Sequence, residues 1–327
     1  NALKIVLDGS GAGGSAVGLD LIGGSSTVRG LVIQNFARAG IRLAGGDNNI
    51  IIGNYIGTDV AGFAAEPNGD GILIDVQGSG PSSNASDNNR IGTNSDGVDD
   101  ACERNVISGN SGNGILSVGT SMATPVGTLI AGNYIGLGAD GLTALGNGRD
   151  GICLTMSNRF RIGVDCASNN FFAGRNVISS NVQDGVRCDD ADSCVVAGNF
   201  IGVAADGSTP RGNGQMGVDF MAGSILNRIG NSLCGPCAND EGNIIANSIG
   251  GEGVQFNGAA SGDTIQNTIL GNAIYNNAGL GICLTPSNCV NDNDLGDGDT
   301  GPNQRQNFPD ITSANGAVIV GNLNSLP

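Results

Sequence analysis

The chain has 327 residues and a formal net charge of −16, with 14 basic residues, 30 acidic residues and no histidine. This balance argues against binding to nucleic acid or to an anionic membrane surface, because both need clustered lysine and arginine. A hydrophobic content of 39% predicts a folded protein. Because 58 glycines accompany nine phenylalanines, three tyrosines and no tryptophan, we expect a thin core that is repeated many times.

The first residues show a strand-like alternation of Leu3, Ile5 and Leu7. This abrupt start, with no signal peptide or membrane span, predicts a mature or excised piece of a longer protein.

Two phrases recur further along the chain. Asn-Val-Ile-Ser-Gly-Asn at 105–110 returns as Asn-Val-Ile-Ser-Ser-Asn at 176–181, and Ile-Ala-Gly-Asn-Tyr-Ile-Gly at 130–136 returns as Val-Ala-Gly-Asn-Phe-Ile-Gly at 196–202. Aligning them predicts one asparagine column: Asn35, Asn54, Asn110, Asn133, Asn181, Asn199, Asn247 and Asn272. A second column is a glycine followed by Ile or Val: Gly40, Gly71, Gly114, Gly151, Gly185, Gly217, Gly253 and Gly281.

The glycine column recurs every 28 to 43 residues, which suits a coil of three short strands and their turns. Stacked asparagines can pass amide hydrogen bonds from coil to coil, so we interpret this ladder as structural. We therefore predict an all-β fold, a right-handed single-stranded parallel β-helix of about nine or ten coils. The alternative, a β-sandwich, would need hairpin turns about every 8–12 residues.

The coils are of two kinds, which predicts a two-coil super-repeat. In one kind a long loop follows the asparagine, at 56–71, 135–151 and 201–217. In the other kind a different loop precedes the asparagine strand, at 90–105, 161–176 and 228–243. Long loops should therefore leave the solenoid at two edges, each on alternate coils.

These strings resemble those of bacterial extracellular right-handed parallel β-helix repeat proteins, which have the pectate-lyase-like superfamily fold. The matching strings are NVISGN, GNYIGTD, GNG-x-x-GI at 146–152 and the tail at 297–309, and the resemblance covers roughly residues 28–312. It implies a module of a large surface or secreted protein with neighbouring domains. We expect a β-helix over 1–312 and the start of a truncated C-terminal β segment over 313–327.

One outward face of the predicted coils carries Arg187, Asp189 and Asp219. An arginine beside carboxylates that hold Ca²⁺ is the pattern by which pectate-lyase-like enzymes abstract a proton next to a uronate carboxylate. The alternative is a solvated ion pair. The polygalacturonase pattern also needs a histidine, which this chain lacks.

Two further sets of residues are candidate sites. Tyr55, Tyr134 and Phe200 follow ladder asparagines in the long-loop coils, where they stack on sugar rings or pack under their own loops. Asp292, Asp294, Asp297 and Asp299 form the densest acidic run of the sequence, near the C-terminus, in which Asp alternates with Gly. Such a run can wrap Ca²⁺ with oxygen ligands, or it can form a solvated acidic turn.

Nine cysteines with local spacings predict disulfides and an oxidising compartment. The predicted pairs are Cys188–Cys194, Cys283–Cys289, Cys234–Cys237 and Cys102–Cys166, which leave Cys153 over. Cys234-Gly-Pro-Cys237 also has redox spacing, but no βαβ unit surrounds it.

The sequence favours an exported scaffold or adhesion module, extracellular or at the cell surface, that contacts a polysaccharide or surface glycan without catalysis. The alternative is a calcium-dependent polysaccharide lyase, or another glycan-processing enzyme, that acts on acidic polysaccharide. Neither hypothesis includes membrane insertion or a nucleic-acid partner.

Overall fold

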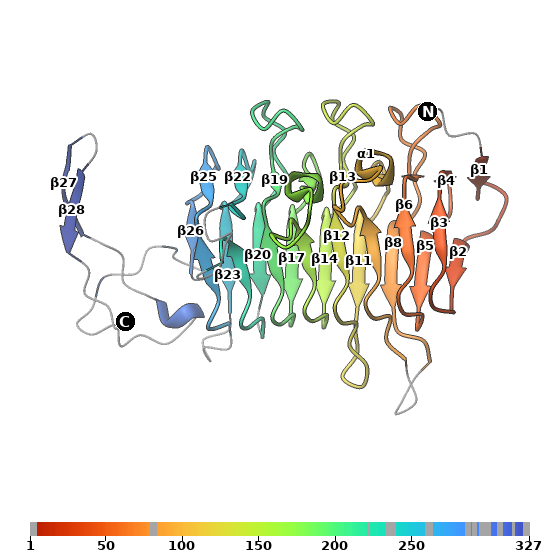
Figure 1. Cartoon of the computed structure of the whole chain (residues 1–327), viewed down its shortest axis with the longest axis horizontal. Coiled ribbons are helices and arrows are strands. Elements are labelled where there is room, and N and C mark those ends of the chain that lie inside the picture. The colour runs from red at the N-terminus through yellow and green to blue at the C-terminus, as the bar shows by residue number, and fades with distance from the viewer. Residues whose placement is uncertain are drawn as a thin grey trace.

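The computed structural model describes residues 5–78, 84–221, 223–232, 240–258, 264–284, 289, 293, 302–305, 310–315 and 318–322. Three long parallel sheets dominate it, and the chain passes through them in turn to form a right-handed parallel β-helix, as predicted (Figure 1). In the part of the chain that the structure describes, sheets A and B each contain nine strands and sheet C contains eight, which gives nine coils. Among the described residues, no helix is long and apolar enough to cross a membrane.

The strands are short and follow one another in a fixed order. Sheet A contains β1 (Ile5–Asp8), β4 (Leu31–Gln34), β7 (Tyr55–Ile56), β10 (Val106–Ile107), β13 (Tyr134–Ile135), β16 (Val177–Ile178), β19 (Phe200–Ile201), β22 (Ile244–Ala246) and β25 (Ala273–Tyr275). Sheet B contains β2 (Val17–Leu21), β5 (Ala39–Ala44), β8 (Asp70–Asp75), β11 (Ile115–Val118), β14 (Ile152–Thr155), β17 (Val186–Asp189), β20 (Val218–Met221), β23 (Val254–Asn257) and β26 (Ile282–Cys283). Sheet C contains β3 (Thr27–Arg29), β6 (Ile50–Ile52), β9 (Arg90–Gly92), β12 (Leu129–Ala131), β15 (Arg161–Gly163), β18 (Val195–Ala197), β21 (Arg228–Gly230) and β24 (Thr268–Leu270).

The core consists of like residues stacked on like residues. Neighbouring strands pair in parallel, so each inward position forms a column along the solenoid axis. One column in sheet A is isoleucine in seven successive coils and is fully buried: Ile33, Ile56, Ile107, Ile135, Ile178, Ile201 and Ile245. This column explains how a chain with few aromatic residues buries a continuous core.

Two asparagine ladders, one at each end of the sheet A strands, replace the single predicted column. The ladder before the strands is Asn54, Asn105, Asn133, Asn176, Asn199, Asn243 and Asn272. The ladder after the strands is Asn68, Asn110, Asn147, Asn181 and Asn213. In each ladder a side-chain oxygen accepts hydrogen bonds from the previous asparagine, as Asn133 Oδ1 does from the backbone N and Nδ2 of Asn105 at 3.3 and 2.9 Å.

The predicted alignment was wrong because the two kinds of coil place asparagines differently. The phrase at 105–110 contains one asparagine of each ladder, since Asn105 precedes β10 and Asn110 follows the tight turn after it. The phrase at 130–136 contains only Asn133, since a long loop separates it from Asn147. Matching Asn110 to Asn133 therefore merged two columns.

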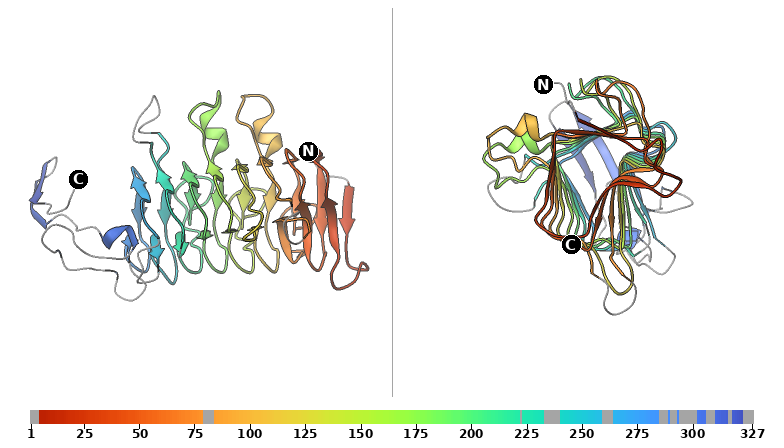
Figure 2. Two further views of the ribbon diagram at one scale, coloured as in Figure 1. Left: turned by 90° about the horizontal axis from the view of Figure 1, so that it is seen from below. Right: turned by 90° about the vertical axis from the view of Figure 1, so that its right-hand side faces the viewer.

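Long loops leave the solenoid on alternate coils, which confirms the two-coil super-repeat. Loops after β7, β13 and β19 each close with an antiparallel bridge, and the next coils have tight turns there. At a second edge, α1 (Asp100–Glu103) and η1 (Phe171–Gly174) lie in two of the other long loops, on the same side of the solenoid (Figure 2). Asn170 Nδ2 joins these two loops by donating to Asp100 Oδ2 at 2.6 Å.

The C-terminal part contains η2 (Pro302–Arg305) and an antiparallel hairpin of β27 (Asp310–Asn315) and β28 (Val318–Asn322). Asn303 Oδ1 accepts a hydrogen bond from the backbone N of Asn267 at 3.0 Å, so η2 continues the stacking at the end of the solenoid. The predicted boundary at residue 313 falls inside β27 and remains a prediction. The predicted calcium ligands Asp292, Asp294, Asp297 and Asp299 lie outside the described residues.

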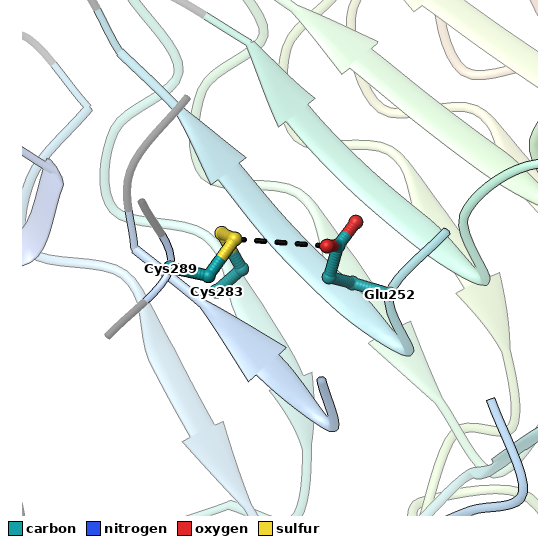
Figure 3. The surroundings of a disulfide bond; sticks show 3 residues. All are labelled: Glu252, Cys283 and Cys289. Atoms are coloured by element: carbon teal, nitrogen blue, oxygen red, sulfur yellow. Dashed lines mark hydrogen bonds between the residues drawn. A yellow bond between two sulfur atoms is a disulfide. The ribbon is translucent and has the colours of Figure 1, made fainter. Parts of the chain in front are cut away.

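One predicted disulfide is confirmed, between Cys283 and Cys289, whose Cα atoms are 4.6 Å apart. Figure 3 shows Cys289 Sγ pointing toward Glu252 Oε1, 3.6 Å away. The predicted Cys188–Cys194 bridge is wrong, because both thiols are free and fully buried. Despite the equal spacing, Cys283 aligns with Arg187, so Cys188 is one residue later and faces the core.

Neither of the other two predicted disulfides is confirmed. Cys102 has a free, exposed thiol, so the predicted bridge to Cys166 is also wrong. Cys234 and Cys237 lie outside the described residues.

We predict that Asn133→Ala lowers the free energy of unfolding by about 2–4 kcal/mol, because it leaves several buried backbone and amide groups without partners. Asn133 Nδ2 donates to Ile91 O and to Asn176 Oδ1, at 2.9 and 3.1 Å. Urea titration measures the change. Asn169→Ala, at an exposed asparagine, serves as control and should change stability by less than about 0.5 kcal/mol. Equal effects of the two variants would contradict the ladder.

We predict that iodoacetamide labels Cys102 in the folded protein but leaves Cys188 and Cys194 unlabelled until the chain unfolds. Burial raises the pKa of Cys194 to about 12 and that of Cys188 well above its usual range, and alkylation needs an accessible thiolate. Cys283 and Cys289 should be labelled only after reduction. Peptide mapping by mass spectrometry checks each position, and labelling of Cys188 under native conditions would contradict the register.

Candidate functional site

The outward face of sheet B brings together polar residues from several coils. Strand pairing aligns Leu73, Leu116, Cys153, Arg187, Asp219, Gln255 and Cys283 in one column. The predicted candidates Arg187 and Asp219 are therefore direct neighbours on β17 and β20, and Asp189 lies two residues further along β17. We call the group formed by Arg187, Asp219, Asp150 and Asp184 the Arg187 cluster.

Two buried aspartates, Asp150 and Asp184, were missed by the sequence analysis. Each precedes a glycine of the glycine column, where Asn113 stands one coil earlier. Asp150 Oδ1 accepts the backbone N–H of Asp184 at 2.9 Å, and Asp184 Oδ1 accepts that of Met216 at 2.8 Å. Both residues are at most 3% exposed. The run of Asn or Asp before the glycine was the sequence signal for them.

The carboxyl groups of this cluster hold their protons unusually strongly. Burial, together with the nearby Asp184, raises the pKa of Asp219 to about 7. Burial also raises the pKa of Asp184 to about 6, with a smaller contribution from Asp150, whose own pKa is raised by burial. The guanidinium of Arg187 opposes all three changes. Neighbouring carboxyls that titrate near neutral pH are typical of acid–base chemistry.

Several polar atoms on this face of sheet B are buried and have no hydrogen-bond partner in the described part of the chain. They are Arg187 Nε, Asp219 Oδ1 and Gln255 Oε1. Arg187 forms no ion pair with Asp219 among the described residues: its Nη2 donates to Met221 Sδ at 2.6 Å and lies 4.0 Å from Asp189 Oδ2. Buried donors and acceptors are normally satisfied, so three unsatisfied atoms on one face mark it as a candidate binding site.

The aromatic candidates lie on the outward side of sheet A, in every second coil. Gly62, Gly141 and Gly207 of the long loops approach the rings of Tyr55, Tyr134 and Phe200 so closely that an added Cβ would lie within 3.0 Å of a ring atom. Arg104 and Arg175 also lie over the rings of Tyr134 and Phe200, 4.3 and 4.1 Å from the ring centres. This packing favours the structural role, and sugar stacking by these rings remains a prediction.

The two groupings of possible metal ligands among the described residues already have other partners. The grouping of Asp165, Cys166 and Glu241 is one of them. Glu241 is 1% exposed, and its two oxygens accept hydrogen bonds from Arg161 and Arg228 at 3.2 and 2.6 Å. Another grouping, Glu252 with Cys283 and Cys289, includes the disulfide sulfurs. Calcium binding therefore remains a prediction that rests on the acidic run at 292–299.

No family model matches the chain, and no curated protein matches it. Among solved structures it is similar to the A-module of the Azotobacter vinelandii mannuronan C-5 epimerase AlgE4, with 16% identity, a TM-score of 0.44, and coverage of 83% of this chain and 58% of that one. It is also similar to a mutant of the periplasmic alginate epimerase AlgG (15%, TM-score 0.39, 80% and 45%) and to an alginate lyase from Paenibacillus sp. str. FPU-7 (14%, TM-score 0.26, 85% and 79%). The chain thus spans about half the length of the two epimerase structures.

We predict that the protein loses stability as the pH rises from about 4 to about 7. In this window the folded state, with the raised pKa of Asp219, binds more protons than the unfolded state, so the free energy of unfolding falls with pH. Asp219→Asn removes this proton uptake. Between pH 5 and pH 8, the free energy of unfolding of the wild type should therefore fall by about 2–4 kcal/mol more than that of the variant. Denaturant titrations at both pH values measure the difference.

Asp99→Asn, at an exposed aspartate, provides the control and should follow the wild type. A pH dependence of Asp219→Asn that parallels the wild type would show that Asp219 ionises normally in the folded protein.

Proposed function

We propose that the chain is a glycan-processing enzyme that acts on acidic polysaccharide at the Arg187 cluster. The observation that carries this proposal is the pair of buried, unsatisfied polar atoms on adjacent strands, Arg187 Nε and Asp219 Oδ1, neither of which has a hydrogen-bond partner among the residues that the structure describes. Arg187 provides the only cation of the cluster, and its fork of donors suits a uronate carboxylate.

In the proposed reaction, each residue has a role in abstracting a proton next to a uronate carboxylate. Arg187 neutralises that carboxylate and so makes the adjacent C5 proton more acidic. Asp184 is ionised above pH 6 and accepts the C5 proton. Asp219 is protonated below pH 7 and donates to the departing O4 oxygen, so that the C4–O4 bond breaks and a C4=C5 double bond forms.

Asp150 acts indirectly in this scheme. It caps the backbone of Asp184, and its negative charge contributes to the raised pKa of that carboxyl. We also propose that the enzyme is exported, since its Cys283–Cys289 disulfide suits an oxidising compartment.

A non-catalytic scaffold or adhesion module is the second candidate function. It is favoured by the capping role of Asp150 and Asp184, which Asn113 fulfils without charge one coil earlier. In this alternative the acids only continue the hydrogen-bonded stack. What distinguishes the two functions is whether the charge of these residues matters, which an Asp→Asn change tests directly because the amide keeps the cap.

We predict that Asp184→Asn and Asp219→Asn each lower kcat/KM on acidic polysaccharides by about 10²–10⁴-fold, because each removes a proton-transfer group. The wild-type pH profile should be bell-shaped, with its maximum between the pKa values of about 6 and about 7 for Asp184 and Asp219. The readout is the ultraviolet absorbance of unsaturated uronate products from polygalacturonate, alginate and glucuronate polymers, measured with and without EDTA.

Arg187→Ala should abolish activity, whereas Arg29→Ala, at an exposed arginine on β3, should leave it unchanged. Glycan binding without any turnover in the wild type would establish the scaffold function instead. Loss of activity with EDTA would confirm the predicted calcium dependence.

A further inference from the structure

A hollow of about 240 Å³ lies at the ends of β11, β14 and β17, the last of which carries Arg187. It is lined by Thr120, Ser121, Thr124, Met156, Asn158, Asp190 and Asp192. One wall is the loop that follows β11, which extends below that strand in Figure 1. The roles assigned to the Arg187 cluster use none of these residues.

The hollow lies at the end of β17, the strand that carries Arg187. Asp190 directly follows β17 and lies three residues beyond Arg187, so their Cα atoms are at most about 10 Å apart. The floor of the hollow is tied to β17, because the backbone N of Met156 donates to Asp189 O at 2.9 Å. If one sugar unit of a polysaccharide binds at Arg187 and the polysaccharide runs along β17, a nearby sugar unit therefore lies in the hollow.

Electrostatics determine which kind of unit fits there. The lining residues include two carboxylates, Asp190 and Asp192, and no lysine or arginine. Asp192 Oδ1 accepts a hydrogen bond from the backbone N–H of Ile225 at 3.0 Å. Asn158 Oδ1 accepts one from the backbone N–H of Asp192 at 2.9 Å, so both side chains are held in place. These carboxylates would repel a second uronate, whereas the hydroxyl groups of a neutral sugar would donate hydrogen bonds to them. Met156 adds an apolar surface for a ring face.

We propose that this hollow is a subsite for an uncharged, hydroxyl-bearing sugar unit and that it excludes a uronate. The substrate is then a mixed polysaccharide, with a uronate at Arg187 and a neutral sugar in the hollow. This inference rests on the proposed function and defines its substrate class.

The test measures binding of four tetrasaccharides to the full chain: alternating glucuronate–glucose, all-glucuronate, all-glucose and all-glucosamine. The wild type should bind the alternating compound most tightly. Asp190→Asn should raise its Kd about tenfold, through loss of charged hydrogen bonds, and should tighten binding of all-glucuronate. Asp190 has φ of 52°, which asparagine also adopts readily, so the variant should fold.

Asp99→Asn is the matched control, since Asp99 has φ of 55°, is exposed and makes no side-chain cap hydrogen bond. Equal wild-type affinity for all-glucuronate and the alternating compound, or no effect of Asp190→Asn, would overturn the subsite and leave turnover at Arg187 intact. Tightest binding of all-glucosamine would show a cation subsite instead. Failure of the wild type to bind or convert any of the compounds would overturn the subsite and the proposed function together.

Discussion

The constraint on which the fold depends is that every bend of the chain must hydrogen-bond to the bends above and below it. A solenoid coil has three bends, and buried backbone groups there have no strand partner. The two asparagine ladders meet this need with side chains that both accept and donate, so that Asn133 connects Asn105 to Asn176 and also binds Ile91 O. The stacked isoleucines then bury apolar surface, but the ladders determine that each coil lies directly over the last.

The candidate site uses the same device with different chemistry. Before the glycine column, an asparagine in one coil is replaced by Asp150 and Asp184 in the next two coils. Each carboxylate performs the cap with one oxygen. Burying the charge of these acids is unfavourable, as the raised pKa values of Asp150 and Asp184 show. The chain therefore has acidic groups where a neutral amide would support the fold equally well, in the coil of Arg187 and in the coil before it.

Much of the fold could be predicted because stacking repeats the same requirement many times. The glycine column recurs at nearly the same position of each coil because a larger residue does not fit there: an added Cβ on Gly71 would lie 2.5 Å from Gly114 O in the next coil. From that column the outward register of Arg187, Asp219, Gln255 and Cys283 follows, and the strand pairing has the same register. The asparagines were harder to assign, because both ladders use the same residue and loop length decides which ladder an asparagine joins.

The site and the cysteines show what a one-dimensional pattern leaves out. Equal spacing suggested that Cys188–Cys194 repeats Cys283–Cys289, yet a difference of one residue in register turns Cys188 into the core. Asp150 and Asp184 were overlooked because a capping aspartate and a catalytic aspartate look identical in sequence. They differ in burial and in the groups around them, which only the packed coils reveal. A buried acid at a position where an amide suffices is thus better evidence of chemistry than any spacing, because it weakens the fold it belongs to.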